Sequence, residues 1–315
     1  MIKIAIIGTG IIGLSHINAI MQTEGCSLAA VCDINEAVAK EIGEKYNVPY
    51  FTDYKDIPSS ADVDAVIINL PHFLHCESTV FFLENGLHVL IEKPMANTVE
   101  ECDKMIAAAK ANGVKLGVGH VQRFFSHNIQ IKELADSGKL GEFCMYTETR
   151  NINYFAETRP KWFLSKEKAG GGISMNYGAH ALDKVFWLLG PQEAKTFGSL
   201  ANLRENQEGI DIEGHAQFIA AFPGGKSASV TLDGYGFVPA TAEYFFTGGS
   251  IRMFEGIGFC YQTDGNWINF EKNPNAKDGM VYQIEEFLKY INGEESLTPD
   301  GEYGRAVIAA LEQLY

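Results

Sequence analysis

Residues 2–13 read IKIAIIGTGIIG, and this stretch decides the fold of the first part of the chain. The unbroken apolar run Ile2–Ile7 predicts a strand that is buried on both faces, and the run Ile11–Thr23 predicts a helix. Three glycines lie at the junction. Gly8 permits a tight turn, Gly10 lets another molecule approach the backbone, and Gly13 lets the helix pack closely on the strand. The stretch therefore predicts a strand, a tight turn and a helix whose N-terminus is open.

The same alternation of strand and helix continues to about residue 118. Further continuous apolar runs predict strands at Ser27–Asp33, Ala65–Asn69, His88–Glu92 and Lys115–Val118. Helical patterns lie between them at Asn35–Tyr46, Cys76–Asn85 and Val99–Asn112. Thr98 and Glu101 form a predicted capping box at the start of the last helix. This alternation predicts parallel strands with right-handed crossovers, and so an α/β, doubly wound parallel sheet.

An acidic residue at a suitable distance turns the glycine turn into a predicted dinucleotide site. The free N–H groups of a helix N-terminus attract phosphate, and Asp33, 20 residues after Gly13, is placed to accept hydrogen bonds from ribose hydroxyls. A carboxylate at this place repels a 2′-phosphate, and the sequence has no arginine before Arg123. NAD is therefore favoured over NADP, in an N-terminal Rossmann domain. The predicted contacts are Gly8, Thr9, Gly10, Ile11, Ile12, Gly13 and Asp33.

The pattern changes near residue 120, which gives a predicted domain 1–120 and a second domain 121–315. After a helix at Ile129–Ser137, strand patterns follow at Phe143–Asn153, Lys195–Leu203, Ile210–Phe222, Lys226–Asp233, Glu243–Thr247 and Ser250–Glu255. Further helices are predicted at Met175–Leu189, Met280–Asn292 and Glu302–Leu314. The second domain is therefore predicted to be α+β, with a mostly antiparallel open sheet.

Composition excludes several classes of function. The 315 residues carry a formal net charge of −15, which argues against a general nucleic-acid binder. No apolar run approaches the roughly 18–20 residues of a membrane-spanning helix. The six cysteines are scattered without a C-x-x-C motif, which favours free thiols in a reducing cytoplasm. The eight histidines are dispersed as well, so no metal site is predicted.

Four motifs then resemble the Gfo/Idh/MocA family of oxidoreductases. They are Leu87–Ala96 (LHVLIEKPMA), Leu70–His75 (LPHFLH), Gly119–Phe124 (GHVQRF) and the triplet Gly170-Gly171-Gly172 that leads to His180 and Asp183. The resemblance implies an NAD-dependent enzyme that transfers a hydride between nicotinamide and a hydroxyl-bearing carbon of a sugar, a sugar derivative or a cyclitol. It also implies a homodimer or homotetramer formed through the sheet of the second domain.

The catalytic candidates are Lys93, His180 and Asn176, and the resemblance implies roles for the first two. Lys93, just past a buried strand, is implied to polarise the reacting hydroxyl or carbonyl, and His180 to share the proton transfer. Asn176, His180 and Asp183 fall on one face of the predicted helix. Relatives commonly have Asp at the position of Asn176. An amide does not ionise and does not raise the basicity of His180, so the base stays open between Lys93 and His180.

Further residues are expected around the two ligands. Asn69, Leu70, Pro71, His75 and Glu92 are expected to line the cofactor cleft with Lys93. Arg123, Tyr154, Trp162 and Tyr177 are substrate candidates, with Asn176 and His180. The stretch Arg123–Lys168, with eight Lys or Arg against six Asp or Glu, also includes Arg150 and Arg159. This local excess leaves an acidic or phosphorylated sugar open as substrate.

Two other functions compete with the dehydrogenase. The first is a related enzyme in which NAD stays bound and oxidation is transient, so that the net reaction is elimination or glycoside cleavage. The second is a non-catalytic regulator that senses a dinucleotide. Asn176 is the feature that favours the regulator, whereas Lys93 and His180 argue against it.

Overall fold

The computed structural model describes residues 1–203, 209–236, 238–254, 258–270 and 276–315. The chain forms two compact units. The first contains Met1–Phe124 and Lys277–Arg305, and the second contains Phe125–Ala276 and Ala306–Tyr315. The first unit thus takes in a segment from late in the chain, beyond the predicted division at residues 120/121. That division stays a prediction about the functional domains.

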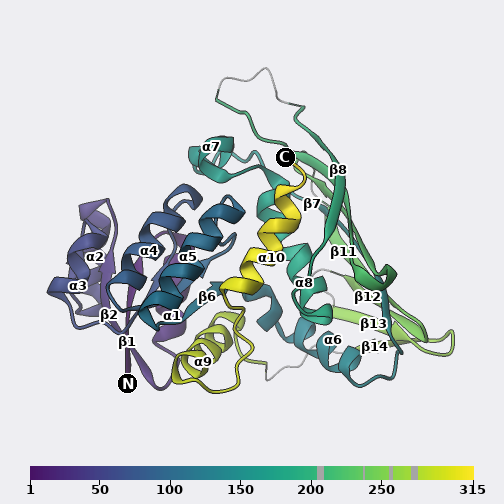
Figure 1. The fold of residues 1–315 in the computed structure, drawn as a ribbon, viewed down its shortest axis with the longest axis horizontal. Coiled ribbons are helices and arrows are strands. Elements are labelled where there is room, and N and C mark those ends of the chain that lie inside the picture. Colours follow the sequence, from purple (N-terminus) through teal and green to yellow (C-terminus); the bar gives the residue numbers. More distant parts are fainter. Residues whose placement is uncertain (204–208, 237, 255–257, 271–275) are drawn as a thin grey trace. The chain divides into compact units, whose positions relative to one another are not determined.

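The first unit is built on a six-stranded parallel sheet with the strand order β3-β2-β1-β4-β5-β6. Figure 1 labels three of its strands, β1, β2 and β6. The strands are β1 (Ile2–Ile7), β2 (Cys26–Cys32), β3 (Tyr50–Phe51), β4 (Ala65–Ile68), β5 (His88–Glu92) and β6 (Leu116–Gly119). The predicted doubly wound sheet is confirmed, and β3 adds a strand that the sequence did not predict. With two residues, β3 is too short to show a pattern. The order reverses direction between β1 and β4, which is where open α/β sheets bind their ligands.

The helices of the first unit lie between these strands along the chain, except for the last one, which follows all of them. They are α1 (Ile11–Ile20), α2 (Glu36–Tyr46), α3 (Ile57–Ser60), α4 (His75–Glu84), α5 (Val99–Asn112) and α9 (Gly279–Asn292). Short 3-10 turns lie at Tyr54–Asp56, His72–Leu74 and Val121–Phe124. Only one of the two hydrogen bonds of the predicted capping box at α5 forms. The Thr98 hydroxyl accepts from Glu101 N at 3.2 Å, but the Glu101 carboxylate accepts from Asn97 N at 2.9 Å, one residue earlier than a reciprocal box requires.

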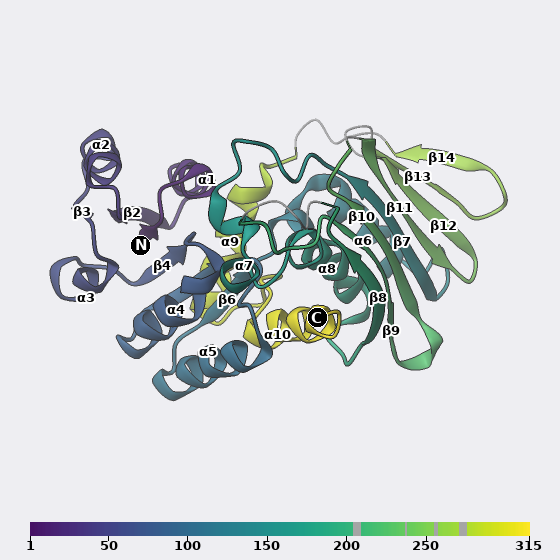
Figure 2. The same ribbon diagram turned by 90° about the horizontal axis from the view of Figure 1, so that it is seen from above.

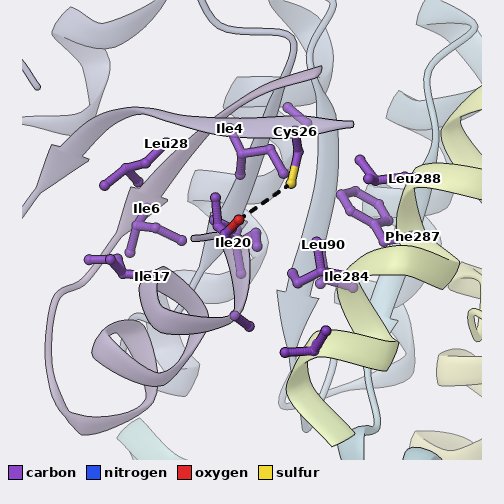
Figure 3. Packing of buried hydrophobic residues seen from close by; sticks show 14 of the residues in the cluster. Ile4, Ile6, Ile17, Ile20, Cys26, Leu28, Leu90, Ile284, Phe287 and Leu288 are labelled. Carbon is purple, nitrogen blue, oxygen red and sulfur yellow. Dashed lines mark hydrogen bonds between the residues drawn. The ribbon is translucent and has the colours of Figure 1, made fainter. Parts of the chain in front are cut away.

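Helix α9 completes the core of the first unit. Its buried residues Ile284, Phe287 and Leu288 belong to the same apolar cluster as residues of β1, α1, β2 and β5. Figure 3 shows these side chains beside Leu90 and Ile20, whose carbonyl accepts from the Cys26 thiol. Full burial of one such side chain stabilises a fold by roughly 1.5–3 kcal/mol. The late segment is therefore an integral part of the first unit.

The second unit contains an eight-stranded sheet with the order β14-β13-β12-β11-β7-β10-β9-β8. The strands are β7 (Phe143–Asn151), β8 (Lys195–Ala201), β9 (His215–Ala221), β10 (Ser227–Asp233), β11 (Val238–Phe246), β12 (Gly249–Phe254), β13 (Gly258–Gln262) and β14 (Trp267–Phe270). Only the β7–β10 pair among these neighbours is parallel, so the predicted mostly antiparallel sheet is confirmed. Strands β13 and β14 were not predicted. Glu255, the last residue of one predicted strand, lies outside the described residues.

The helices of the second unit are α6 (Ser126–Asp136), α7 (Lys166–Ala169) and α8 (Ala179–Leu189), with 3-10 turns at Lys161–Leu164 and Pro223–Gly225. Helix α10 (Gly301–Glu312) crosses the boundary between the units. Helix α8 packs on β7 and β10, and Figure 2 shows α6 and α8 on one face of the sheet. The predicted helix Met175–Leu189 instead begins as a π-helical turn, Ser174–Gly178, and becomes α-helical at Ala179.

Candidate active site

One edge of the parallel sheet collects the predicted residues of the first unit. Gly8, Asp33 and Lys93 directly follow β1, β2 and β5, and Asn69 follows β4. These are four neighbouring strands in the order β2-β1-β4-β5, and all are parallel. Their carboxyl ends therefore meet at the edge where the strand order reverses. The sequence placed these residues on separate loops, and the sheet brings the loops together.

The glycine turn is shaped by close backbone contacts. Gly8 has φ of +87°, and a Cβ at this position would lie 2.8 Å from the carbonyl oxygen of Asn69. A Cβ on Gly13 would lie 2.1 Å from the carbonyl oxygen of Gly8. A Cβ on Gly10 would meet nothing within 4 Å. Gly8 and Gly13 are therefore required by the fold itself, whereas Gly10 is required only if a ligand approaches.

The start of α1 has the features of an anion site. No side chain caps the helix at Gly10, and its first turn carries no acidic residue, so the free N–H groups face outward. The first two side chains are apolar and yet exposed, by 86% at Ile11 and 44% at Ile12. A bound dinucleotide fits this turn: its pyrophosphate would occupy the open side of Gly10, and its body would cover the exposed isoleucines.

Asp33 is held in place from two sides. Its Oδ2 accepts hydrogen bonds from the Thr9 amide at 3.0 Å and the Thr9 hydroxyl at 2.8 Å, and its Oδ1 accepts from Asn35 N at 3.0 Å. Thr9 is buried, so its side chain is directed toward Asp33 rather than outward. Thr9 therefore orients the carboxylate that is predicted to bind the ribose.

Glu92, the residue before Lys93, forms a partly buried pair with His16 that the sequence did not reveal. Glu92 Oε1 lies 2.9 Å from Nε2 of His16 in α1, and Glu92 Oε2 accepts from Lys93 N at 3.3 Å. His16 is fully buried, and a Cβ on Gly119 would lie 2.9 Å from Glu92 Oε1. The signal for His16 is its position on the inner face of α1, three residues after Gly13. The pair fixes the backbone from which Lys93 projects, just before a cis peptide to Pro94.

His75 joins two loops of the predicted cofactor cleft. Its Nε2 lies 2.8 Å from the Leu70 carbonyl, and its Nδ1 lies 2.9 Å from the Pro94 carbonyl. Burial lowers the pKa of His75, while the two carbonyls and Glu92 oppose this shift. His75 therefore holds the Leu70-Pro71 loop to the turn that follows Lys93.

Arg123, a predicted substrate contact, is buried with only 3% of its surface exposed. Its guanidinium donates to the Leu297 carbonyl at 3.2 Å and lies 4.5 Å from the centre of the Tyr303 ring. These contacts bind the late segment to the rest of the first unit. They give Arg123 a structural role that the sequence did not predict.

In the second unit, the π-helical turn carries Asn176 and leads to His180 and Asp183. All three are buried. π-Helical turns inside α-helices are rare and occur frequently at functional sites. The predicted face with Asn176, His180 and Asp183 is thus formed by two kinds of helix rather than one.

The glycine triplet before this turn is packed around one carboxylate. Glu213 accepts from Gly172 N at 2.8 Å, Ser174 N at 3.0 Å and the Tyr315 hydroxyl at 2.7 Å, and also from the Ser174 hydroxyl. A Cβ on Gly171 would lie 1.9 Å from the Tyr315 hydroxyl, and one on Gly172 would lie 2.0 Å from the Glu213 carbonyl. The triplet therefore lets Glu213 bind the start of the turn that carries Asn176.

Two tyrosines lie beside these residues. Tyr154 is fully buried, and its hydroxyl has no hydrogen-bond partner among the described residues. Burial raises the pKa of Tyr154, although Arg159 and Asn176 oppose this shift. The Tyr177 ring lies 6.3 Å from that of Tyr154 and 6.1 Å from that of His180. The structure thus brings together four of the predicted residues: Tyr154, Asn176, Tyr177 and His180.

The predicted Trp162 lies in a second aromatic group. Its ring stacks on Phe163 at 3.7 Å, and Phe163 also lies 5.0 Å from the guanidinium of Arg159. Trp162 is half-buried. Through Phe163 and Arg159 it is connected to Tyr154.

A buried ionic cluster lies under α8. Glu148 is bound by Lys184 Nζ at 3.0 Å, Arg150 Nε at 3.0 Å and the Tyr146 hydroxyl at 2.5 Å. Burial alone would raise the pKa of Glu148, but the two cations and the tyrosine lower it to about 2. The guanidinium of Arg150 also lies 5.5 Å from the Tyr177 ring. Because Lys184 is on α8, the cluster anchors the helix that carries His180.

Among the described residues, no group of three or more His, Cys, Asp or Glu side chains is arranged to hold a metal ion. No described helix combines the length and the apolar character needed to cross a membrane.

Comparison with known proteins agrees with this architecture. Residues 2–120 match the family described as "Oxidoreductase family, NAD-binding Rossmann fold", and residues 128–252 match the "GFO/IDH/MocA C-terminal domain". The first match places the first unit in a family of oxidoreductases with an NAD-binding Rossmann fold. The chain belongs to the Gfo/Idh/MocA family, as its motifs indicate.

Individual relatives carry several names. A 2,7-anhydro-N-acetylneuraminate hydratase of Mediterraneibacter gnavus is 32% identical over 64% of this chain and 54% of its own length. The chain thus spans about half the length of such curated relatives. A scyllo-inositol 2-dehydrogenase (NADP(+)) of Bacillus subtilis is 28% identical over 98% of this chain and 94% of its own.

Among solved structures, the aldose-aldose oxidoreductase of Caulobacter crescentus superimposes with a TM-score of 0.89 at 25% identity. The superposition covers 99% of this chain and 95% of the chain of that enzyme. The fold is therefore shared along the whole chain.

Proposed function

We propose that the protein is an NAD-dependent dehydrogenase or reductase that acts on a hydroxyl-bearing carbon of a sugar, a sugar derivative or a cyclitol. The observation that carries the proposal is the sheet edge on which Gly8, Asp33 and Lys93 follow neighbouring parallel strands. Relatives named as inositol dehydrogenases and an aldose-aldose oxidoreductase support this substrate class. NAD is favoured over NADP because the fixed carboxylate of Asp33 repels a 2′-phosphate.

Each part of the site has a separate task. When bound, NAD supplies or accepts the hydride. The open N-terminus of α1 binds the pyrophosphate, and Asp33 binds the ribose. Lys93 and His180 handle the proton of the reacting hydroxyl, and Asn176 orients that hydroxyl by hydrogen bonding. Glu92, His16 and His75 hold the backbone around Lys93, while Glu213 holds the turn that carries Asn176.

A test separates binding from chemistry at Lys93. The Lys93→Met variant should bind NAD as the wild type does, while turnover on an inositol and sugar panel falls by a factor on the order of 10²–10⁴. The control is Lys55→Met, which removes an exposed lysine paired with Glu77 at 3.0 Å and should leave both properties unchanged. Retained turnover in Lys93→Met would contradict the proposal.

A second candidate function is a net elimination or hydration in which oxidation is transient. The relative named as a 2,7-anhydro-N-acetylneuraminate hydratase favours it. The two functions differ in the net amount of NADH that is formed or consumed per molecule of substrate. Substrate consumption without accumulation of NADH would select the second function.

We also propose that the protein forms a homodimer or homotetramer through the sheet of the second unit. Phe197 and Ile219 are cross-strand partners on β8 and β9, and they are 66% and 51% exposed. Exposed apolar pairs of this kind are typical of interaction surfaces.

We place the protein in the cytoplasm. All six cysteines are free, which favours a cytoplasmic location.

A further inference from the structure

Arg159 differs from other arginines of the chain in its surroundings. Arg150, Arg252 and Arg305 each pair with a carboxylate, at 3.0, 2.9 and 2.5 Å. Arg159 makes no ion pair with any carboxylate in the part of the chain that the structure describes, and its Nε is buried without a hydrogen-bond partner. Arg159 is half-buried, so its guanidinium loses part of its hydration without compensation from a carboxylate of the described chain.

The guanidinium of Arg159 is nevertheless held in a defined place. It lies 4.0 Å from the centre of the Tyr154 ring and 5.0 Å from that of Phe163. Tyr154 is itself fixed, because its backbone amide donates to the carbonyls of Ile152 and Gly234 at 2.9 Å each. Aromatic faces attract a guanidinium but do not use its N–H donors. The donors of Arg159 are therefore positioned for another group.

This cation lies next to the predicted reaction centre of the second unit. The Tyr154 ring that it covers lies 6.3 Å from the ring of Tyr177, which follows Asn176 on the π-helical turn, and the Tyr177 ring lies 6.1 Å from that of His180. The carboxylate that contributes to the raised pKa of Tyr154 is that of Glu213. Glu213 already accepts hydrogen bonds from Gly172, Ser174 and Tyr315. It therefore serves the glycine triplet rather than Arg159.

We propose that Arg159 binds an oxyanion of the substrate, a carboxylate or a phosphate, and so makes the enzyme specific for acidic sugars. The inference rests on the proposed function and names its substrate class. A planar guanidinium offers two parallel donors to an oxyanion, and such charged hydrogen bonds are among the strongest in proteins. Tyr154 presents the guanidinium, and Asn176 orients the hydroxyl at the other end of the same ligand.

The test measures binding rather than turnover, so that it does not depend on the identity of the reaction. D-glucuronate, D-glucose 6-phosphate and D-glucose are titrated by calorimetry into the wild-type protein in the presence of NADH. We expect at least one of the two anions to bind about 10- to 100-fold more tightly than glucose, the range that a charged hydrogen bond provides. The anion that shows the preference identifies the source of the oxyanion.

Variants assign this preference to Arg159. Arg159→Gln should bind the anion and glucose with similar affinity, whereas Arg159→Lys should keep part of the preference. The matched control is Arg252→Gln, which removes an arginine that also lies on an aromatic ring, 4.8 Å from Trp267, but is paired with Glu243. It should behave as the wild type. Circular dichroism confirms that each variant is folded.

The outcomes separate the two proposals. If the wild type shows no preference for either anion, or if Arg159→Gln keeps the preference, the role of Arg159 is overturned. If the preference depends on Arg159 but no sugar is turned over, the anion site is supported and the proposed dehydrogenase activity fails.

Discussion

The hydroxyl of Thr9 donates a 2.8 Å hydrogen bond to Oδ2 of Asp33, which is 24 positions further along the chain. The bond joins the glycine turn after β1 to the end of β2. It means that the residue predicted to bind the ribose is oriented by the loop predicted to bind the pyrophosphate.

Removal of this hydroxyl should weaken cofactor binding without unfolding the protein. The Thr9→Val variant keeps the shape and the backbone amide, so Asp33 loses one of its donors. We expect the affinity for NADH to fall roughly 2- to 10-fold, which corresponds to one net hydrogen bond. Fluorescence titration with NADH measures this loss of affinity.

The charge of Asp33 should decide between the two cofactors. Asp33→Asn removes the charge and should raise the ratio of NADP affinity to NAD affinity. An unchanged ratio would refute the role of that charge.

Two glycines of the same turn should respond differently to alanine. Gly10→Ala places its Cβ in open space, so the melting temperature should stay the same while NAD affinity falls at least 10-fold. Gly13→Ala places its Cβ 2.1 Å from a carbonyl oxygen, so the fold itself should be destabilised by roughly 1–3 kcal/mol. Thermal unfolding and NADH titration on both variants distinguish the effects. Equal destabilisation of the two variants would show that Gly10 has a structural task.

The partly buried His16–Glu92 pair should be needed for both stability and turnover. His16→Leu leaves a carboxylate oxygen without its partner at 2.9 Å, and this should lower the free energy of unfolding by about 1–3 kcal/mol. Turnover should fall as well, because Glu92 also binds the Lys93 amide. Urea unfolding measures the first effect. Asn18→Ala, on the exposed side of the same helix, is the control and should change stability by less than about 0.5 kcal/mol.

Glu148 should make stability depend on acid pH. Its pKa is about 2 in the folded protein, below the ordinary value of 4.5, so its contribution is complete above pH 4.5 and is lost as the pH falls toward 2. Glu148→Gln removes the buried charge that Arg150 and Lys184 bind and should cost roughly 3–5 kcal/mol near neutral pH. The difference in stability between wild type and variant should therefore shrink between pH 5 and pH 3.

Two further variants test that explanation. Glu243→Gln breaks the more exposed pair with Arg252 and should cost at most about 1 kcal/mol. Adding Lys184→Met to Glu148→Gln should recover part of the lost stability, because one unpaired buried cation is removed. A double variant that is less stable than Glu148→Gln alone would argue against charge as the cause.

The sequence predicted what depends on neighbours along the chain. The glycine turn, the alternation of strands and helices, and the acid after β2 are local patterns, and each appears where expected. The missed elements lack such patterns. β14 is an edge strand whose first three residues are all exposed, so it shows no alternation of burial. The amphipathic pattern of α9 predicts a helix but does not say which core it joins.

The missed parts of the site are pairs that are far apart in sequence. His16 and Glu92 are separated by 76 positions, Glu148 and Lys184 by 36, and Ser174 and Tyr315 by 141. A lone buried histidine or lysine has no sequence signature of its partner, because the partner is chosen by tertiary packing. The π-helical turn was missed for a related reason, since its residues resemble those of an ordinary helix.

The position of α9 in the chain has a consequence for folding during synthesis on the ribosome. Residues 125–276 are synthesised after the strands of the first unit and before the helix that covers them. At about 5–20 residues per second, this interval lasts roughly 8–30 seconds. During that time the apolar surface around Ile20 and Leu90 is not yet covered by Ile284 and Phe287 of α9. The cofactor-binding unit is thus begun first and finished late, and in the meantime the nascent chain offers that surface to chaperones.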